Sequence, residues 1–251
     1  MQNIKLTDQE LNIIKTKHRL KNADGREGFI CCYEDEGKKV ALKIFDTKNH
    51  DMLANKEKKI ILLNNMNLDS NILTPIKTVS NHNEIVGYTQ EFIWPHKTFD
   101  DLKLNTKASV KLDYLRQAKQ LIENLHENGI IHADINSFNF MVNHGTVKLC
   151  DIDNSQIGDL ANDVSIYYVN NYKKYNNGEI DFNCDIYSFN IITIALLKKY
   201  DDLGAQFHIE SYISYKDWVN NMYNKMKLWN HQFEGDYFID NIDKKTKIKF
   251  L

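Results

Sequence analysis

Two aspartates and an asparagine stand at spacings that could let them act together. Asp134 and Asn139 lie in the polar stretch 132–139, and Asp151 follows twelve residues after Asn139, directly behind the mostly apolar run 147–150. If a hairpin joins the two loops, the three side chains can meet at one point. Carboxylate and amide oxygens at such a point suit Mg²⁺, and a further carboxylate suits a general base or an orienting group.

The segments around these residues predict elements that could hold them in place. Residues 107–128 carry an apolar stripe at helical spacing and end at Gly129, as a helix should. His126 in its last turn is interpreted as a packing residue. Residues 185–197 read as a buried helix opened by the acidic Asp185, whose charge suits the start of a helix.

The first third of the chain predicts a small sheet with helices. Helical patterns cover residues 8–18 and 50–66. Residues 40–45 read as a buried strand, and 72–76 and 84–93 read as two strands around a polar turn at 80–83. Together the strands predict a small antiparallel sheet.

Lys43 is the one charged residue inside the apolar strand 40–45. A buried ammonium group is costly unless it has a partner, which favours a functional role for Lys43. Gly25 and Gly28, in the turn before this strand, lack a Cβ and could let backbone N–H groups approach phosphates. Taken alone, these glycines fit an ordinary hairpin turn better than a phosphate-binding loop.

In this order, these features resemble the protein-kinase-like superfamily. The stretch 132–139 is similar to the kinase catalytic loop His-Arg-Asp-x-x-x-x-Asn, and Asp151 is similar to the aspartate of Asp-Phe-Gly. The resemblance covers roughly residues 20–200. It implies a bilobal α+β kinase fold forming one kinase domain. The N-lobe, 1–93, would hold an antiparallel sheet with one main helix, and the C-lobe, 94–251, would be reduced and mostly helical.

The resemblance also implies a role for each matching residue. Lys43, held by Glu57 on the helix 50–66, would contact the α- and β-phosphates of ATP, and Asp134 would orient the acceptor hydroxyl. By itself, Glu57 would read as part of a solvated face. Asn139 and Asp151 would bind Mg²⁺ or Mn²⁺. The nucleotide would contact Gly25, Gly28, Ile30, Ala41, Lys43, the gatekeeper Gln90, Glu91, Ile93 and Met141.

His132 and Asp185 would have structural roles, since in kinases the matching aspartate accepts backbone N–H groups from the catalytic loop. Asp153, which could add a metal-binding carboxylate, and Ser165, in the expected activation segment 154–180, are additional candidates.

Three departures from the kinase pattern keep alternatives open. Ala133 replaces the usual arginine, so no cation there receives a phosphorylated activation loop, and no catalytic-loop lysine or arginine accompanies Asn136. Asp151-Ile-Asp replaces Asp-Phe-Gly. The leading hypothesis is a divergent Ser/Thr-type protein kinase. A small-molecule kinase of the aminoglycoside or choline type and a nucleotide-binding pseudokinase are the alternatives, although the retained Lys43, Asp134 and Asn139 argue against the last.

Composition limits the classes of binding partner and the cellular compartment that we expect for this protein. The chain has 251 residues, 42% hydrophobic and 26% charged, with a formal net charge of −2. These values predict a globular protein without a global attraction to nucleic acid or membrane. The four cysteines lack metal-site spacing and read as reduced thiols. We expect a cytoplasmic protein, or a secreted effector without a cleavable signal, with ATP and a protein or small-molecule hydroxyl as partners.

Overall fold

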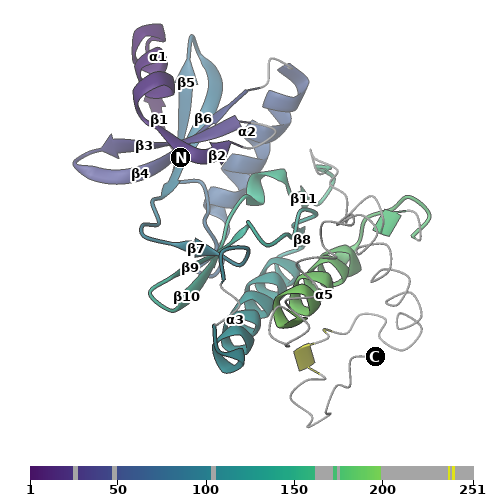
Figure 1. Ribbon diagram of the computed structural model, residues 1–251. Helices are drawn as coiled ribbons and strands as arrows, with labels where there is room; N and C mark the ends of the chain where they lie inside the picture. The colour runs from purple at the N-terminus through teal and green to yellow at the C-terminus, as the bar shows by residue number, and fades with distance from the viewer. Residues whose placement is uncertain are drawn as a thin grey trace, which may run out of the picture.

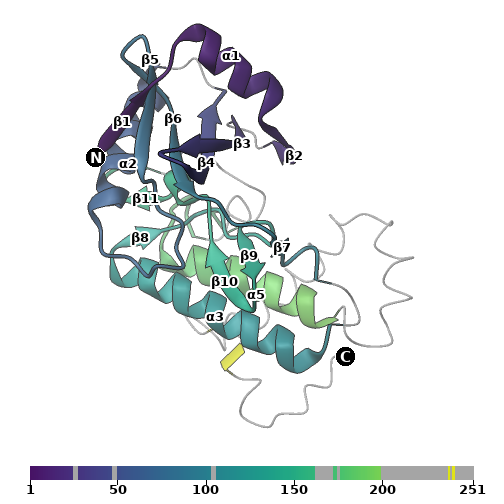
Figure 2. The ribbon, with the colours of Figure 1, turned by 90° about the vertical axis from the view of Figure 1, so that its left-hand side faces the viewer.

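The computed structural model describes residues 1–24, 28–46, 50–102, 106–161, 172–173, 176–198, 237 and 239–240. In the orientation of Figure 1, a six-stranded sheet with two helices lies above two long helices that run side by side with short strands next to them. Figure 2 shows the same two parts from the side. This arrangement confirms the predicted bilobal α+β kinase fold.

The upper sheet is mixed and has the strand order β1-β5-β6-β4-β3-β2. Its strands are β1 (Gln2–Lys5), β2 (Arg19–Asp24), β3 (Gly28–Asp35), β4 (Lys38–Phe45), β5 (Lys77–Asn81) and β6 (Glu84–Glu91). All neighbours are antiparallel except β1, an unpredicted strand that pairs in parallel with β5. The strand predicted at 72–76 begins instead at Lys77, because Leu73 N–H donates to the Leu149 carbonyl of the lower part.

Helices cover both faces of this sheet. Helix α1 (Asp8–Lys17) begins with a capping box between Thr7 and Glu10, and its Ile14 packs with Leu42 and Ile44 on one face. Helix α2 (His50–Asn65) packs Ile60 against Phe45 and Tyr88 on the other face. Side chains alternate along a strand, so Lys43, between Leu42 and Ile44, faces α2.

The lower part is built on helices α3 (Ala108–Glu127) and α5 (Phe182–Lys198), which pack together. Short strands β7 (Lys97–Thr98), β8 (Ile130–Ile131), β9 (Phe140–Asn143), β10 (Thr146–Leu149) and β11 (Gln156–Ile157) lie beside them, with the 3₁₀ helix η1 (Ile152–Asn154). The predicted helix 107–128 and the hairpin before Asp151 are confirmed. Helix α5 begins three residues before Asp185, and Asp181 caps it by accepting from the Asn183 N–H at 2.9 Å.

One hydrophobic core fills the lower part and reaches the upper one. Leu63 of α2 and Ile152 of η1 join residues of α3, β9 and α5, including Leu115, Phe140 and Phe189. All four cysteines are free, as predicted. Among the described residues, no helix combines the length and apolar character that crossing a membrane requires.

Candidate active site

The loop that carries Asp134 is fixed from behind by Asp185. The two carboxylate oxygens of Asp185 accept the N–H groups of His132 at 2.7 Å and Ala133 at 2.8 Å. His126, in the last turn of α3, places Nε2 3.1 Å from the same carboxylate and stacks near Phe182. Asp185 is completely buried. Asp185 thus holds the backbone of residues 132 and 133, and His126 contacts the same carboxylate.

His132 joins the two loops of the site. Its Nδ1 accepts the Asp134 N–H at 3.2 Å, so the ring proton lies on Nε2, which donates to the Cys150 carbonyl at 3.0 Å. The ring is completely buried. Since Cys150 directly precedes Asp151, the His132 ring ties the loop of Asp134 to the segment of Asp151.

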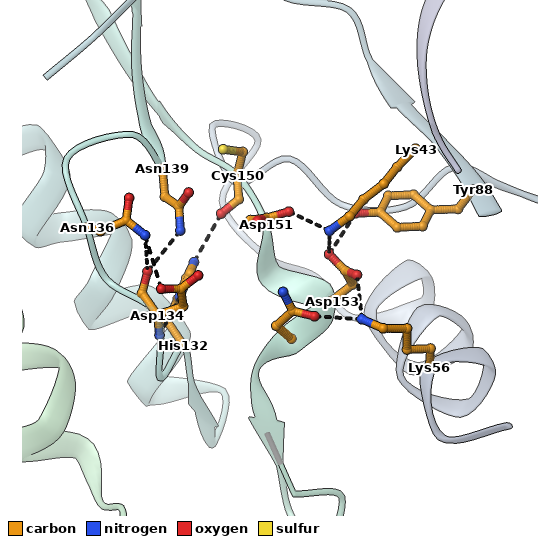
Figure 3. A network of polar contacts seen from close by, with 11 residues as sticks. Lys43, Lys56, Tyr88, His132, Asp134, Asn136, Asn139, Cys150, Asp151 and Asp153 are labelled. Atoms are coloured by element: carbon orange, nitrogen blue, oxygen red, sulfur yellow. Dashed lines mark hydrogen bonds and ion pairs between the residues drawn. The ribbon is translucent and has the colours of Figure 1, made fainter. Parts of the chain in front are cut away.

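Asp134 and Asn139 lie together on this loop (Figure 3). Asn139 Nδ2 donates to the Asp134 carbonyl at 2.8 Å, and Asn136 Nδ2 donates to Asp134 Oδ1 at 3.0 Å. Burial is the main cause that raises the pKa of Asp134 to about 6, and the nearby Asp151 charge acts in the same direction. At neutral pH the carboxylate is therefore mostly ionised and has one oxygen that accepts no bond from the described residues.

Asp151 and Lys43 face each other across the two parts of the molecule. Lys43 Nζ lies 2.5 Å from Asp151 Oδ1, and Lys43 is only 5% exposed. The loop at Asp151 has a left-handed backbone, with φ 66°. The prediction that Lys43 is a buried lysine with a partner is confirmed, but the partner differs from the one expected.

Glu57 does not hold Lys43 in this structure, and that prediction is wrong. Glu57 is exposed, whereas Lys43 Nζ donates to Asp151 and to Asp153, the latter at 2.7 Å. The inward side of α2 is set by Ile60 and Leu63, both completely buried. Residue 56 shares that side at helical spacing and residue 57 does not. Helix α2 therefore turns Lys56, not Glu57, toward the site.

Asp153 is the centre of a buried network (Figure 3). Its Oδ1 accepts from Lys43 Nζ and from the Tyr88 hydroxyl at 2.8 Å, and its Oδ2 lies 3.2 Å from Lys56 Nζ. Lys56 Nζ also donates to Asn154 Oδ1 at 2.6 Å. With two lysines and a hydroxyl on one carboxylate, Asp153 is a poor metal ligand, so the metal role considered for it is not supported.

The electrostatics of the network keep all its charges in place. Burial alone would raise the pKa of Asp153, but Lys43 and Lys56 outweigh burial and hold the pKa well below its usual range. Burial likewise would lower the pKa of Lys43, but Asp151 and Asp153 outweigh it and raise the pKa. Burial and Asp153 both raise the pKa of Tyr88, which stays a protonated donor. Lys56 and Tyr88 were missed by sequence reasoning; the spacing Lys56, Ile60, Leu63 was the available signal for Lys56.

Strand register places three of the residues that were predicted to contact the nucleotide beside Lys43. Ile30 pairs with Lys43, and Ala41, two residues before Lys43, pairs with Gln90. Directly paired residues share a face of the sheet, so Ile30, Ala41 and Gln90 lie on the Lys43 face. The Gln90 Oε1 is buried and has no hydrogen-bond partner among the described residues. Such an acceptor fits the amino group of an adenine.

The remaining predicted contacts lie where β6 ends. The Glu91 side chain is exposed and pairs with Lys148 Nζ at 2.9 Å, while its backbone lies in the β4–β6 pairing opposite Val40. The Ile93 carbonyl accepts from His96 Nδ1 at 2.8 Å. Met141 packs with Ile93, Leu73 and Cys150. The structure thus brings Met141 and Ile93 into one apolar cluster.

The glycine positions are only partly described. Gly28 begins β3, where a Cβ would lie 2.0 Å from the Ile44 carbonyl oxygen of β4, so close strand packing alone requires glycine there. Gly25 and Ser165 lie outside the described residues.

Asn139 and Asp151 supply the oxygen ligands that Mg²⁺ prefers. Since Asn139 Nδ2 donates to Asp134, its Oδ1 is left as an acceptor, and Asp151 Oδ2 accepts no hydrogen bond from the described residues. One amide and one carboxylate oxygen match the usual protein contribution to a magnesium site beside substrate phosphates. The residues therefore fit the metal that the sequence predicted.

A comparison with known families agrees with this geometry. The family model described as protein kinase domain matches residues 25–242. The match contains the strand with Lys43, the loop with Asp134 and Asn139, the segment with Asp151, and Asp185 behind them. A kinase is a phosphotransferase. From its fold, its site and this match, the chain belongs to the protein kinase family.

Proposed function

We propose that this kinase transfers the γ-phosphate of ATP to a serine or threonine hydroxyl of a protein. The observation that carries the proposal is that direct bonds join the four expected groups into one site. Asn139 is bonded to Asp134, Lys43 is bonded to Asp151, and His132 connects the two loops. Such a site works by positioning and charge neutralisation and needs no covalent intermediate.

The nucleotide would lie against the Lys43 face of the sheet. Lys43 would contact the α- and β-phosphates, and the backbone near Gly25 and Gly28 would approach the phosphates. Gln90, the Glu91 carbonyl and the Ile93 N–H would meet the adenine edge. Ile30, Ala41 and Met141 would pack on its two faces. The shared face of Ile30, Ala41 and Lys43 supports this placement.

Asn139 and Asp151 would hold Mg²⁺, or Mn²⁺ in its place. When bound, the metal neutralises charge on the phosphate oxygens. Asp134 would accept a hydrogen bond from the acceptor hydroxyl, orient it and take its proton late. The Asn136 amide bonded to Asp134 Oδ1 leaves the other oxygen for that hydroxyl.

A small-molecule hydroxyl is the second candidate acceptor. The observation that favours it is that Asn136, a neutral amide, bonds to Asp134 in a loop that has no lysine or arginine from 132 to 139. Most protein kinases keep a cation in this loop for the γ-phosphate. The strand sequence Val40-Ala41-Leu42-Lys43 and the glycine at 28 favour the protein acceptor as the first candidate.

The test is phosphoryl transfer from radiolabelled ATP with Mg²⁺, comparing the wild type with Asp134→Ala and Asp151→Ala. Label on the protein itself or on a generic protein acceptor, absent in both variants and after removal of Mg²⁺ with EDTA, is the expected result. Glu127→Gln, a change at an exposed side chain in the last turn of α3, is the matched control and should keep the label. Transfer to metabolites alone would support the second candidate. Binding of ATP without turnover would contradict both and favour a pseudokinase.

A further inference from the structure

The inward side of helix α2 carries a cation where a kinase helix usually offers a glutamate. Lys56 is completely buried, and its Nζ contacts Asp153 and Asn154 of η1. Glu57, the acidic neighbour, is exposed. The helix therefore brings positive charge to Lys43, which is itself a cation.

Asp153 supplies the negative charge next to Lys43 that helix α2 does not provide. It is completely buried and accepts from Lys43, Tyr88 and Lys56 on its two oxygens. A buried carboxylate is stable only when it is paired and fully hydrogen-bonded, and each of these donors comes from a different element. Asp153 thus joins β4, β6 and α2 at one point.

The two carboxylates beside Lys43, Asp151 and Asp153, differ in whether they can turn toward a bound nucleotide and its metal. Asp151 is about one-third exposed at its side chain (36%), and it is the residue that would hold the metal. The Asp153 side chain is 0% exposed and cannot turn to a ligand without giving up its contacts with Lys43 and Lys56. Of the two carboxylates that the described residues place on Lys43, Asp153 is the one that would stay in place after Asp151 has turned to the metal.

We propose that Asp153 is the positioning residue for Lys43, in place of a helix glutamate, and that Lys56 docks helix α2 onto the same carboxylate. This rests on the proposed function, because Lys43 is the residue that would contact the phosphates. In this arrangement helix α2 is docked onto the residues that follow Asp151. Its orientation depends on a lysine of the helix and a carboxylate of that segment, whereas a kinase helix usually offers the carboxylate itself.

The first experiment moves the carboxylate that would hold Lys43 from position 153 to position 56 on helix α2. Lys56→Glu alone and Asp153→Gly alone should each lower kcat/KM for phosphoryl transfer on the order of 100-fold, since misplacing a phosphate-binding group has effects of this size. The double variant Lys56→Glu with Asp153→Gly supplies a helix carboxylate for Lys43 and should recover to within about 10-fold of the wild type. Lys58→Glu, on the exposed side of the same helix, is the control and should be unchanged. Two fully active single variants, or a double variant no better than the worse single one, would overturn the proposal.

The second experiment measures how much Lys43 contributes to nucleotide binding, and it needs no phosphoryl transfer. Calorimetric titration with Mg²⁺–ATP should show that Asp153→Asn and Lys43→Met each weaken binding, and that Asp153→Asn adds nothing in the Lys43→Met background. Full additivity of the two changes would contradict a role through Lys43, even if the variants are less stable. If the wild type binds ATP and transfers no phosphate, the proposed function fails while this cycle still decides the role of Asp153.

Discussion

At the level of single residues, the most constrained position is Ala133, next to the proposed catalytic aspartate. Its φ is 58°, a left-handed value that costs a residue with a Cβ about 1–2 kcal/mol. The bond from its N–H to Asp185 and the neighbouring bond from His132 hold the chain in this conformation. One buried carboxylate thus fixes the backbone on which Asp134 is mounted.

Asp185→Asn should therefore lower both stability and activity. An amide offers one acceptor oxygen where two backbone N–H groups now bond, so one buried donor loses its partner, at a cost of about 1–3 kcal/mol. Urea denaturation should show this loss, and ATP turnover should fall with it. Asp181→Asn is the control, because asparagine caps a helix as well as aspartate does. Wild-type turnover in Asp185→Asn would show that the loop does not depend on this carboxylate.

Single residues also show where sequence reasoning succeeds and fails. Lys43 could be recognised as a buried lysine in need of a partner, because the apolar strand around it implies that need. The partner could not be recognised: Asp153 is 110 residues away, and only the docking of η1 under the sheet brings it near. On α2, apolar Ile61 and Leu62 beside Ile60 and Leu63 hide which side faces inward. The resemblance to the kinase helix points to Glu57, which is exposed.

Among the elements, strands β4 and β6 approach each other most closely beside Lys43. Gly87 of β6 pairs with Ile44, and a Cβ at Gly87 would lie 2.1 Å from the Lys43 carbonyl oxygen. That atom belongs to the backbone and cannot turn aside. The position of Lys43 along the sheet thus depends on the absence of a side chain on the neighbouring strand.

Gly87→Ala should push β4 away from β6 and misplace Lys43. We expect a loss of about 1–3 kcal/mol in the free energy of unfolding, as for other overpacked sites, and weaker binding of Mg²⁺–ATP. Thermal denaturation and calorimetric titration would measure the two effects. Val86→Ala, a truncation on the same strand that packs toward α1, should cost stability without weakening ATP binding. Unchanged ATP affinity in Gly87→Ala would contradict the link to Lys43.

At the scale of the whole molecule, the upper and lower parts share one core through Leu63. This residue belongs to α2, is completely buried and packs in the cluster of α3 and α5. Ile152, which follows Asp151, packs in the same cluster. The helix that faces the sheet is therefore also part of the core of the lower lobe.

Leu63→Ala should destabilise the whole protein in a single transition. Truncating a buried leucine costs about 2–5 kcal/mol, and here the lost contacts belong to both parts. Urea denaturation followed by tryptophan fluorescence and by circular dichroism should give coincident curves, shifted together. Leu53→Ala, which removes contacts only within the upper part, is the control and should cost less. Two separate transitions, with only one affected by Leu63→Ala, would disprove a shared core.

The overall fold could be predicted from the sequence because each of its main elements is formed by one local segment, and the segments follow one another in a recognisable order. Helix periodicity predicts α2 and α3, and the short distance between the loops of Asn139 and Asp151 favours a hairpin that joins them. What was missed depends on contacts between distant segments. Ile72 and Leu73 resemble a strand of the sheet but pair with Leu149, and residues 2–5 become a strand only because β5 lies beside them.

Strand β1 has a consequence for how the protein behaves in solution. It pairs along β5 from Gln2 to Lys5, and the Leu6 N–H and carbonyl are bonded to Ser80 and Asn81. Without these residues, β5 would be an open edge whose backbone groups could recruit the edge of another molecule. Strand β1 is itself the last strand of the sheet and has only four residues, and a short edge strand is a weaker template for another molecule. We therefore expect that losing its pairing with β5 would show first as aggregation.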